Sequence, residues 1–136
     1  METIRLEATE KSPGIEFDPQ NRTFEMVGNS RPENVRDFFK PVLDKLRANF
    51  EEFLEQKEPV TDQDPLKCMF KLEYFNSSSA KFISDILVMI GNYNKKGVPV
   101  KLYWYFKEGD EDMLEVGEDF SEMIDMPFQM IMREKK

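Results

Sequence analysis

The chain reads LEYFNSSSAKFI from residue 72 to residue 83, and this stretch decides the fold. Its apolar first residues predict the end of a β-strand, and Phe82 and Ile83 begin the apolar stripe of an amphipathic helix. Three consecutive serines, Ser77 to Ser79, lie at the junction. Backbone N–H groups in the first turn of a helix have no partner within the helix, so that end is electropositive. The sequence therefore predicts a cluster of hydroxyls at the positive end of a helix, at the carboxyl end of a strand.

Apolar patterning on either side of this junction predicts the remaining elements. Alternating or continuous apolar runs predict strands, and apolar residues three and four positions apart predict helices. The predicted order is three strands followed by helix, strand, helix, strand, helix and strand. These elements occupy residues 3–8, 15–17, 23–27, 30–54, 67–75, 82–93, 98–106, 113–124 and 128–132. Because a β-α-β connection joins parallel strands by a right-handed crossover, we predict an α/β fold with a mixed β-sheet and helices mainly on one face.

The first predicted helix carries two further signals. Ser30 with Glu33 fits a reciprocal capping box, and Pro32 fits the first turn, where its missing N–H has no intrahelical partner. Pro41 falls inside the same helix and predicts a kink or a division into two helices. The polar stretch 55–64 predicts the loop that leads to the next strand.

Composition limits the class of protein before any motif is considered. The chain has 136 residues, 40% of them hydrophobic, so we expect one domain over residues 1–136 with a buried core. Its net charge of −8 argues against binding to nucleic acid or to an anionic membrane, since both require a cationic surface. No apolar run reaches the ~20 residues that span a bilayer, and no signal-peptide pattern is present. A single cysteine, Cys68, excludes an internal disulfide. We therefore expect a cytoplasmic protein.

The absence of histidine is the strongest negative signal in the sequence. It removes the usual general base, the Ser–His and Cys–His nucleophile pairs, and the usual nitrogen ligand of metals. Glycine-rich phosphate-binding loops are absent as well. The acidic run 108–112 lacks the ligand spacing and the central glycine of a calcium loop, and a charged helix start explains it better. The sequence predicts no catalytic residue, no metal site and no cofactor.

Three interpretations of the serine run stay open on composition alone. In the first, one serine caps the helix and stabilises it by about 1 kcal/mol, while the others fill a tight turn. In the second, a phosphorylated serine places about −1.5 to −2 charges at the helix end, where free N–H donors partly neutralise them. In the third, a serine acts as a nucleophile and needs a base within hydrogen-bond reach, for which Lys81 or a carboxylate is the candidate. The third interpretation has the weakest support.

Several short motifs point to a known family. The most specific are YFNSSSAK at residues 74–81 and the Pro-Glu-Asn triplet at residues 32–34. Further landmarks lie at residues 7–9, 12–13, 28–34 and 38–42. Together they resemble the SiaC family of biofilm-regulation phosphoproteins along nearly the whole chain.

The resemblance implies a phosphoswitch. The family is similar in architecture to bacterial anti-sigma-factor antagonists, STAS-like domains that carry a phosphorylatable hydroxyl at a helix start. By this resemblance, a Ser/Thr protein kinase of the histidine-kinase ATPase type adds the phosphate, and a metal-dependent PP2C-type phosphatase removes it. The unmodified form binds and activates an effector, a diguanylate cyclase. Ser77 stands where family members typically carry the acceptor threonine, with Ser78 and Ser79 as further candidates. The implied partner-binding residues are Pro32, Glu33, Asn34, Asn76, Ser78 and Lys81.

We therefore predict a non-catalytic regulatory domain of a bacterial partner-switching pathway, controlled at Ser77. A small hydrolase-like enzyme that uses the serine cluster remains an alternative, and it requires a deep pocket around Ser77 with a lysine or carboxylate in reach. A plain scaffold or dimerisation module, in which the serines only cap the helix, is the other alternative. An exposed Ser77 hydroxyl favours the switch, and a hydroxyl buried in the apolar interior excludes it.

Overall fold

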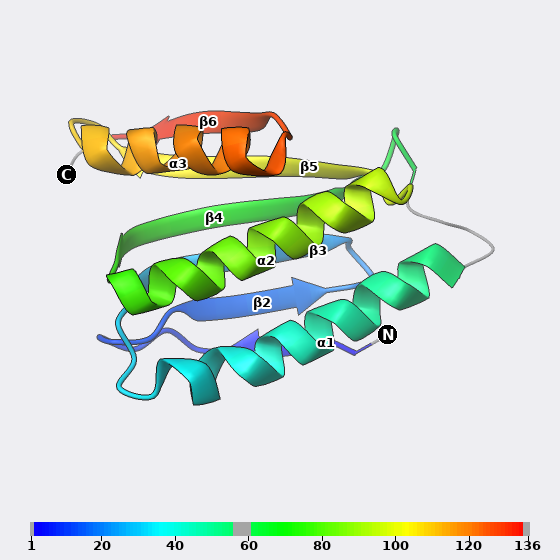
Figure 1. Cartoon of the computed structure of the whole chain (residues 1–136), viewed down its shortest axis with the longest axis horizontal. Coiled ribbons are helices and arrows are strands. Elements are labelled where there is room, and N and C mark those ends of the chain that lie inside the picture. The colour runs from blue at the N-terminus through cyan, green and yellow to red at the C-terminus, as the bar shows by residue number, and fades with distance from the viewer. Residues whose placement is uncertain (1, 56–60, 135–136) are drawn as a thin grey trace.

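A computed structural model describes residues 2–55 and 61–134 of the chain. The elements follow in the order predicted from the sequence (Figure 1). They are β1 (Ile4–Leu6), β2 (Gly14–Asp18), β3 (Thr23–Ser30), α1 (Val35–Glu55), β4 (Leu66–Phe75), α2 (Ser77–Lys95), β5 (Val100–Lys107), α3 (Glu111–Ile124) and β6 (Phe128–Arg133).

The strands form a six-stranded sheet in the order β1-β2-β3-β4-β5-β6. The β1/β2 and β2/β3 pairs are antiparallel, and every pair from β3 to β6 is parallel. Each parallel pair is joined by one of the helices, and Figure 1 shows α1, α2 and α3 in front of the same face of the sheet. The predicted fold class, a mixed α/β sheet with helices on one face, is confirmed. Because β3, β4 and β5 run parallel, their carboxyl ends meet at one edge, and α2 and α3 both begin there.

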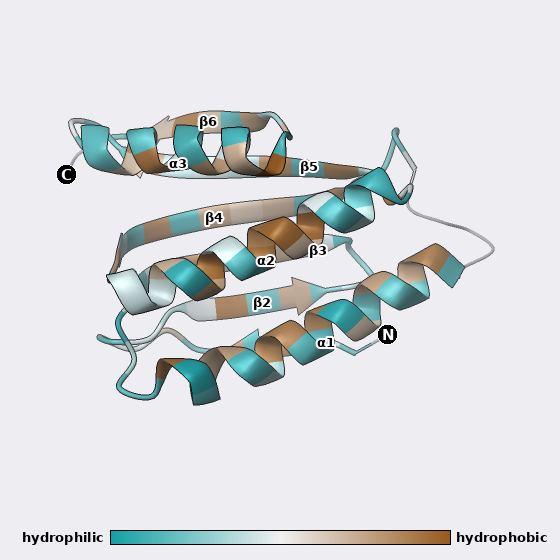
Figure 2. Cartoon of the chain, in the orientation of Figure 1, coloured by the Kyte–Doolittle hydropathy of each residue, from teal (hydrophilic) through white to brown (hydrophobic). Residues whose placement is uncertain are grey.

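Helices α1 and α2 lie side by side and run in the same direction (Figure 1). The Phe39 ring stacks on Phe82 with centroids 5.4 Å apart, and the Phe50 ring stacks on Tyr93 at 4.8 Å. The two contacts are separated by about three turns on each helix, so the helices keep register along most of their length. Figure 2 shows the apolar residues recurring along both helices, as the amphipathic pattern predicts.

Helix α3 packs closely on Trp104 of β5. Trp104 on β5 is fully buried, and its indole N–H donates to the Met113 carbonyl at 2.9 Å. Gly117 lies over this ring, and a Cβ atom at that position would come within 2.4 Å of Trp104 Cδ1. Glycine is therefore required at residue 117 by the approach of the helix to the indole ring.

The predicted start of the first helix is wrong, because the helix begins at Val35 and Pro32 therefore precedes its first turn. Ser30 does not cap it, because Ser30 is the last residue of β3 and is fully buried. The helix begins at Val35, where the Asn34 carbonyl accepts from the N–H of Phe38 at 3.0 Å. Pairing of β3 with β4 extends the strand through the segment that local patterning assigns to a helix start.

The predicted division of this helix at Pro41 does not occur, because α1 continues as one helix to Glu55. Pro41 is exposed, while its neighbours Phe39 and Val42 are buried against the sheet. Packing of that apolar face offsets the backbone hydrogen bond that proline removes. Residues 56–60 of the predicted 55–64 loop lie outside the described residues.

Candidate functional site

The candidate site begins with a β-bulge where β3 pairs with β4. The register shifts between Gly28 and Asn29, so that the pairing skips Glu73. An extra residue in one strand reverses the alternation of side chains beyond it. Phe75 consequently packs against the core, and Tyr74 is 50% exposed. The residue before the last of β4 thus exposes an aromatic ring at the surface, close to the start of α2.

Asn76 caps the start of α2. Its side-chain oxygen accepts from the backbone N–H of Ser79 at 2.9 Å, and its backbone is extended. Ser77 is the first helical residue. The interpretation in which a serine caps this helix is therefore wrong, because an asparagine side chain already occupies the capping position.

Ser79 is separated from the other two serines by its environment. It is fully buried, and its hydroxyl lies 2.8 Å from the hydroxyl of Ser30, which is equally buried. The backbone N–H of Asn76 also donates to the Ser30 carbonyl at 3.1 Å. The first turn of α2 is thus fastened to the end of β3 through one side-chain and one backbone hydrogen bond.

Ser77 and Ser78 are exposed. Neither hydroxyl forms a side-chain hydrogen bond with another described residue. The first turn of α2 contains no acidic side chain. The site is therefore an electropositive helix end with two free hydroxyls on its surface, which meets the exposure condition set by the sequence analysis.

Lys81 lies one turn beyond Ser77 on α2. Its ammonium is 3.2 Å from the Asp85 carboxylate and 4.7 Å from the centre of the Phe82 ring, and its side chain is 70% exposed. The hydrogen bond of this ammonium goes to the Asp85 carboxylate and not to a serine hydroxyl. The hollow to which Lys81 contributes, about 610 Å³ in volume, is not lined by Ser77 or Ser78. Two other hollows in the described part of the chain are not lined by these serines either, so none of the three hollows supports the enzyme hypothesis.

The structure brings the motif segments together at this edge of the sheet. Residues 31–34 leave β3 beside the start of α2, because Ser30 is bonded to both Asn76 and Ser79. The loop around residues 9–12 reaches the same place, where the N–H of Arg31 donates to the Lys11 carbonyl at 2.6 Å. Pro32 is half-buried, while Glu33 and Asn34 are exposed.

Other candidate sites are explained by ordinary structure. Cys68 is buried in β4, and burial raises the pKa of its thiol, so it is an inert core residue. Within residues 2–55 and 61–134, no group of three or more metal-ligating side chains is assembled. No helix in the same ranges is long and apolar enough to cross a membrane. The Ser30–Ser79 bond was missed by sequence reasoning, because no local pattern links residues this far apart.

The fold and the site together define a small α/β regulatory domain with accessible hydroxyls at a helix start. Comparison with known proteins identifies the family. The chain matches the SiaC family regulatory phosphoprotein over residues 6–133, and it belongs to that family. A family of regulatory phosphoproteins confirms the predicted signalling, non-catalytic class of protein.

Individual relatives agree with this assignment. An uncharacterized protein of Pseudomonas aeruginosa strain UCBPP-PA14 is 33% identical over 128 residues, which is 94% of each chain. The solved structure of SiaC of Pseudomonas aeruginosa matches with a TM-score of 0.76 and 30% identity, covering 99% of this chain and 100% of that one. A further structure, of the diguanylate cyclase SiaD in complex with its activator SiaC from the same organism, matches with a TM-score of 0.76 and 31% identity. That match covers 97% of this chain and 99% of the other. The likeness to anti-sigma-factor antagonists stays a prediction.

Proposed function

We propose that this chain is a phosphoswitch whose unmodified form binds and activates a diguanylate cyclase, and that phosphorylation of Ser77 disrupts this binding. The partner class is supported by the related SiaC, which is the activator in the solved complex with SiaD. The regulation is supported by the family, which consists of regulatory phosphoproteins. Both the cyclase and an ATP-dependent kinase use nucleotides of the cytoplasm, so we place the switch there.

The observation that supports the start of α2 as the modified site is the contrast between the starts of α2 and α3. Each helix is capped by a side-chain oxygen, from Asn76 in α2 and from Asp110 in α3. The first turn of α3 contains two carboxylates, whereas the first turn of α2 has only serines. The negative charge that favours a helix start is thus already present at α3 and missing at α2, where a phosphate would supply it.

Among the three serines, accessibility ranks Ser77 and Ser78 above Ser79. A kinase must draw the hydroxyl into its own active site, and the Ser79 hydroxyl is fully buried against Ser30. Ser77 is favoured over Ser78 by the family resemblance of the surrounding motif. We assign the enzymes of the switch as a Ser/Thr kinase of the histidine-kinase ATPase type and a PP2C-type phosphatase.

The partner-binding surface that we propose surrounds this hydroxyl. One part of it is the segment that follows β3 next to α2, which contains Pro32, Glu33 and Asn34. The other part is the start of α2 itself, with Asn76, Ser78 and Lys81. A phosphate adds about −1.5 to −2 charges in the middle of these residues. Repulsion and desolvation of that charge at an interface would release the partner without unfolding the domain.

The test is phosphorylation of the full chain by its cognate kinase with ATP, followed by intact-mass measurement. We expect one phosphate on the wild type and none on Ser77→Ala, with Ser79→Ala as the matched control that is still modified. If phosphate is still incorporated into Ser77→Ala but not into Ser78→Ala, the modified residue is Ser78 and not Ser77. The phosphorylated protein should lose binding to the cyclase, and undiminished binding would contradict the switch.

A further inference from the structure

We propose that the groove between α1 and α2 is the surface on which an acidic, amphipathic helix of the partner protein docks. This proposal rests on the proposed function, because it assigns the partner of the same switch. Two hollows form the groove, one of about 610 Å³ near the start of α2 and one of about 380 Å³ toward its end. They share Leu43 and Arg47, so they are parts of one continuous depression, which we call the α1–α2 groove.

The α1–α2 groove concentrates positive charge on a chain that is otherwise acidic. Two carboxylates line it, Asp44 and Asp85. The cations that line it are Arg36, Lys40, Arg47, Lys81 and Lys96. The whole chain has a net charge of −8, so the cations gathered here are a local exception. A partner surface of negative charge is therefore attracted to this part of the molecule and repelled by most of the rest.

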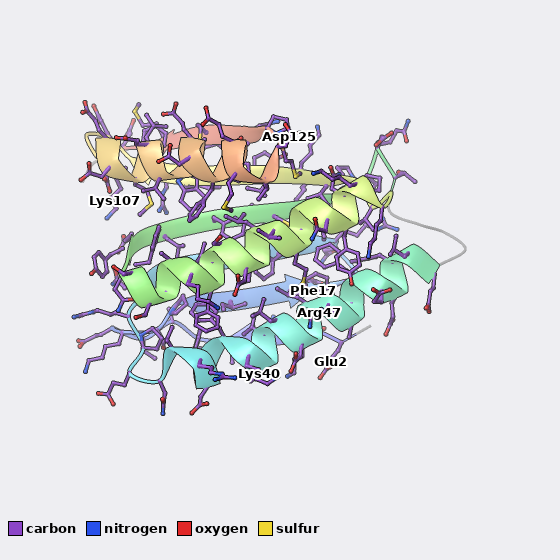
Figure 3. The ribbon with its side chains drawn as sticks, viewed as in Figure 1. Glu2, Phe17, Lys40, Arg47, Lys107 and Asp125 are labelled. Atoms are coloured by element: carbon purple, nitrogen blue, oxygen red, sulfur yellow. The ribbon has the colours of Figure 1, made fainter. Side chains whose placement is uncertain are left out.

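Three of these cations pair with the two carboxylates, so the excess of positive charge comes from five cations against two acids, and Lys81 is paired with Asp85 at 3.2 Å. Asp44 is shared between Lys40 at 3.3 Å and Arg47 at 3.8 Å. Lys96 lies 5.0 Å above the centre of the Tyr93 ring. Arg36 forms no ion pair with any described residue. Figure 3 labels Lys40 and Arg47 along α1, the helix that forms one wall of the groove.

Apolar side chains also line the α1–α2 groove, among its charged residues. Leu43 and Phe82 are half-buried, and Met89 is nearly buried. Val88 is 41% exposed, an unusual exposure for a valine on a helix that is otherwise packed on its apolar side. A depression lined by both apolar and positively charged side chains fits an amphipathic helix, whose apolar face contacts the former and whose acidic residues contact the latter.

The dimensions agree with a helical partner. From Lys81 to Lys96 the groove follows α2 for about 20 Å at 1.5 Å per residue. That length accommodates about four turns of a third helix lying along the two parallel helices. Acidic side chains on both flanks of such a segment would meet Arg36 and Lys40 on one side and Lys81 on the other.

The position of the groove also explains how a phosphate at its mouth would act. Lys81 borders the groove and lies one turn from Ser77 on α2. A phosphate on Ser77 would compete with the partner for this ammonium and would place like charge at the end of an acidic segment. Docking and modification would therefore oppose each other through a shared cation.

The experiment is site-specific photo-crosslinking of the full chain in its native cells. Benzoylphenylalanine replaces Val88 in the groove or, as a matched control, the exposed Lys101 on the opposite face of β5. After irradiation, mass spectrometry identifies the peptide joined to each position. We expect Val88 alone to yield a partner peptide with an excess of Asp and Glu and with apolar residues at helical spacing. A basic or extended peptide, a peptide of a second copy of this chain, equal yields at both positions or no product at Val88 would each overturn the proposal.

Charge reversal then tests the electrostatics with the captured partner in purified form. We expect Arg36→Glu and Arg47→Glu each to weaken binding at least tenfold, and Lys101→Glu to change it less than twofold, with thermal unfolding unchanged in all three. If both groove variants bind with wild-type affinity and phosphorylation still abolishes binding, docking in the α1–α2 groove is refuted and the phosphoswitch is retained. Loss of binding in the variants, with wild-type binding indifferent to phosphate, would retain the groove and refute the switch.

Discussion

The starts of α2 and α3 are built from the same parts and differ in charge. Each helix follows a parallel strand, and each has an Asx side chain that accepts from the third backbone N–H of the helix, at 2.9 Å in α2 and 3.1 Å in α3. At α3 the cap is the carboxylate of Asp110, followed by Glu111 and Asp112. At α2 the cap is the neutral amide of Asn76, followed by serines. The electropositive end is therefore neutralised within the chain at α3 and left for an added anion at α2.

The difference shows that hydroxyls at a helix start indicate a modification site only when they do not serve as the cap and when no acidic side chain lies in the same turn. Many helices begin with a serine that serves as the cap. Here the cap is Asn76, so the exposed Ser77 and Ser78 are not needed to satisfy the backbone. Because these two hydroxyls have no capping role and no acidic side chain lies in the first turn of α2, they are available for modification.

The largest expected effect distinguishes the buried serine from its exposed neighbours. Ser79→Asp places a carboxylate where the side chain is fully buried against Ser30, so we expect a loss of about 3 kcal/mol in the free energy of unfolding. Ser77→Asp is the matched control and should leave this free energy nearly unchanged or slightly raised, because its side chain is exposed at the positive helix end. Urea unfolding followed by circular dichroism measures both. Equal stability of the two variants would show that the three serines are not distinguished by burial.

A smaller effect is expected from exchanging the two caps. Asn76→Asp should raise the free energy of unfolding by about 0.3–1 kcal/mol at low salt, because α2 has no other acid in its first turn. Asp110→Asn should lower it by no more than that amount, since Glu111 and Asp112 remain at α3. Both effects should shrink as salt screens them. Unfolding at two salt concentrations checks this, and a salt-independent change would mean that the caps differ in geometry and not in charge.

The smallest effect concerns the phosphate itself. With phosphoserine installed at residue 77, we expect the second phosphate pKa to lie below that of free phosphoserine, because the helix end and Lys81 favour the dianion. A lowered pKa adds stability that is present above the free value of about 6 and lost as pH falls through the folded value. Phosphorus NMR titration measures it. Lys81→Gln should move the pKa upward, Lys101→Gln should not, and a pKa equal to that of the free amino acid would remove the electrostatic argument for this site.

Much of the fold could be predicted because its signals are local. Alternating strands and helical stripes are each contained within a few residues, and they led to the correct order of elements. The errors at Ser30 and Pro41 arose where pairing with β4 and packing on the sheet overrode local preference. The exposed Tyr74 depends on the β-bulge, whose register can be read only from two strands together.

Some features of the candidate site could likewise be predicted from the sequence, and others could not. The serine run and its position at a helix start follow from spacing alone. The cations of the α1–α2 groove are scattered through two helices and look like ordinary solvated charges on each of them. Only the parallel packing of α1 on α2, set by the Phe39–Phe82 and Phe50–Tyr93 stacks, brings them to one surface.

By itself, the sequence determined the alternation of strands and helices, the family and the cluster of hydroxyls before α2, because these properties depend on neighbours along the chain. The tertiary structure alone decided which serine is buried and where positive charge gathers. Ser30 and Ser79 are 49 residues apart and meet only because β3 and β4 are neighbours in the sheet. Contacts of that separation depend on the packing of the whole domain, which no local pattern contains.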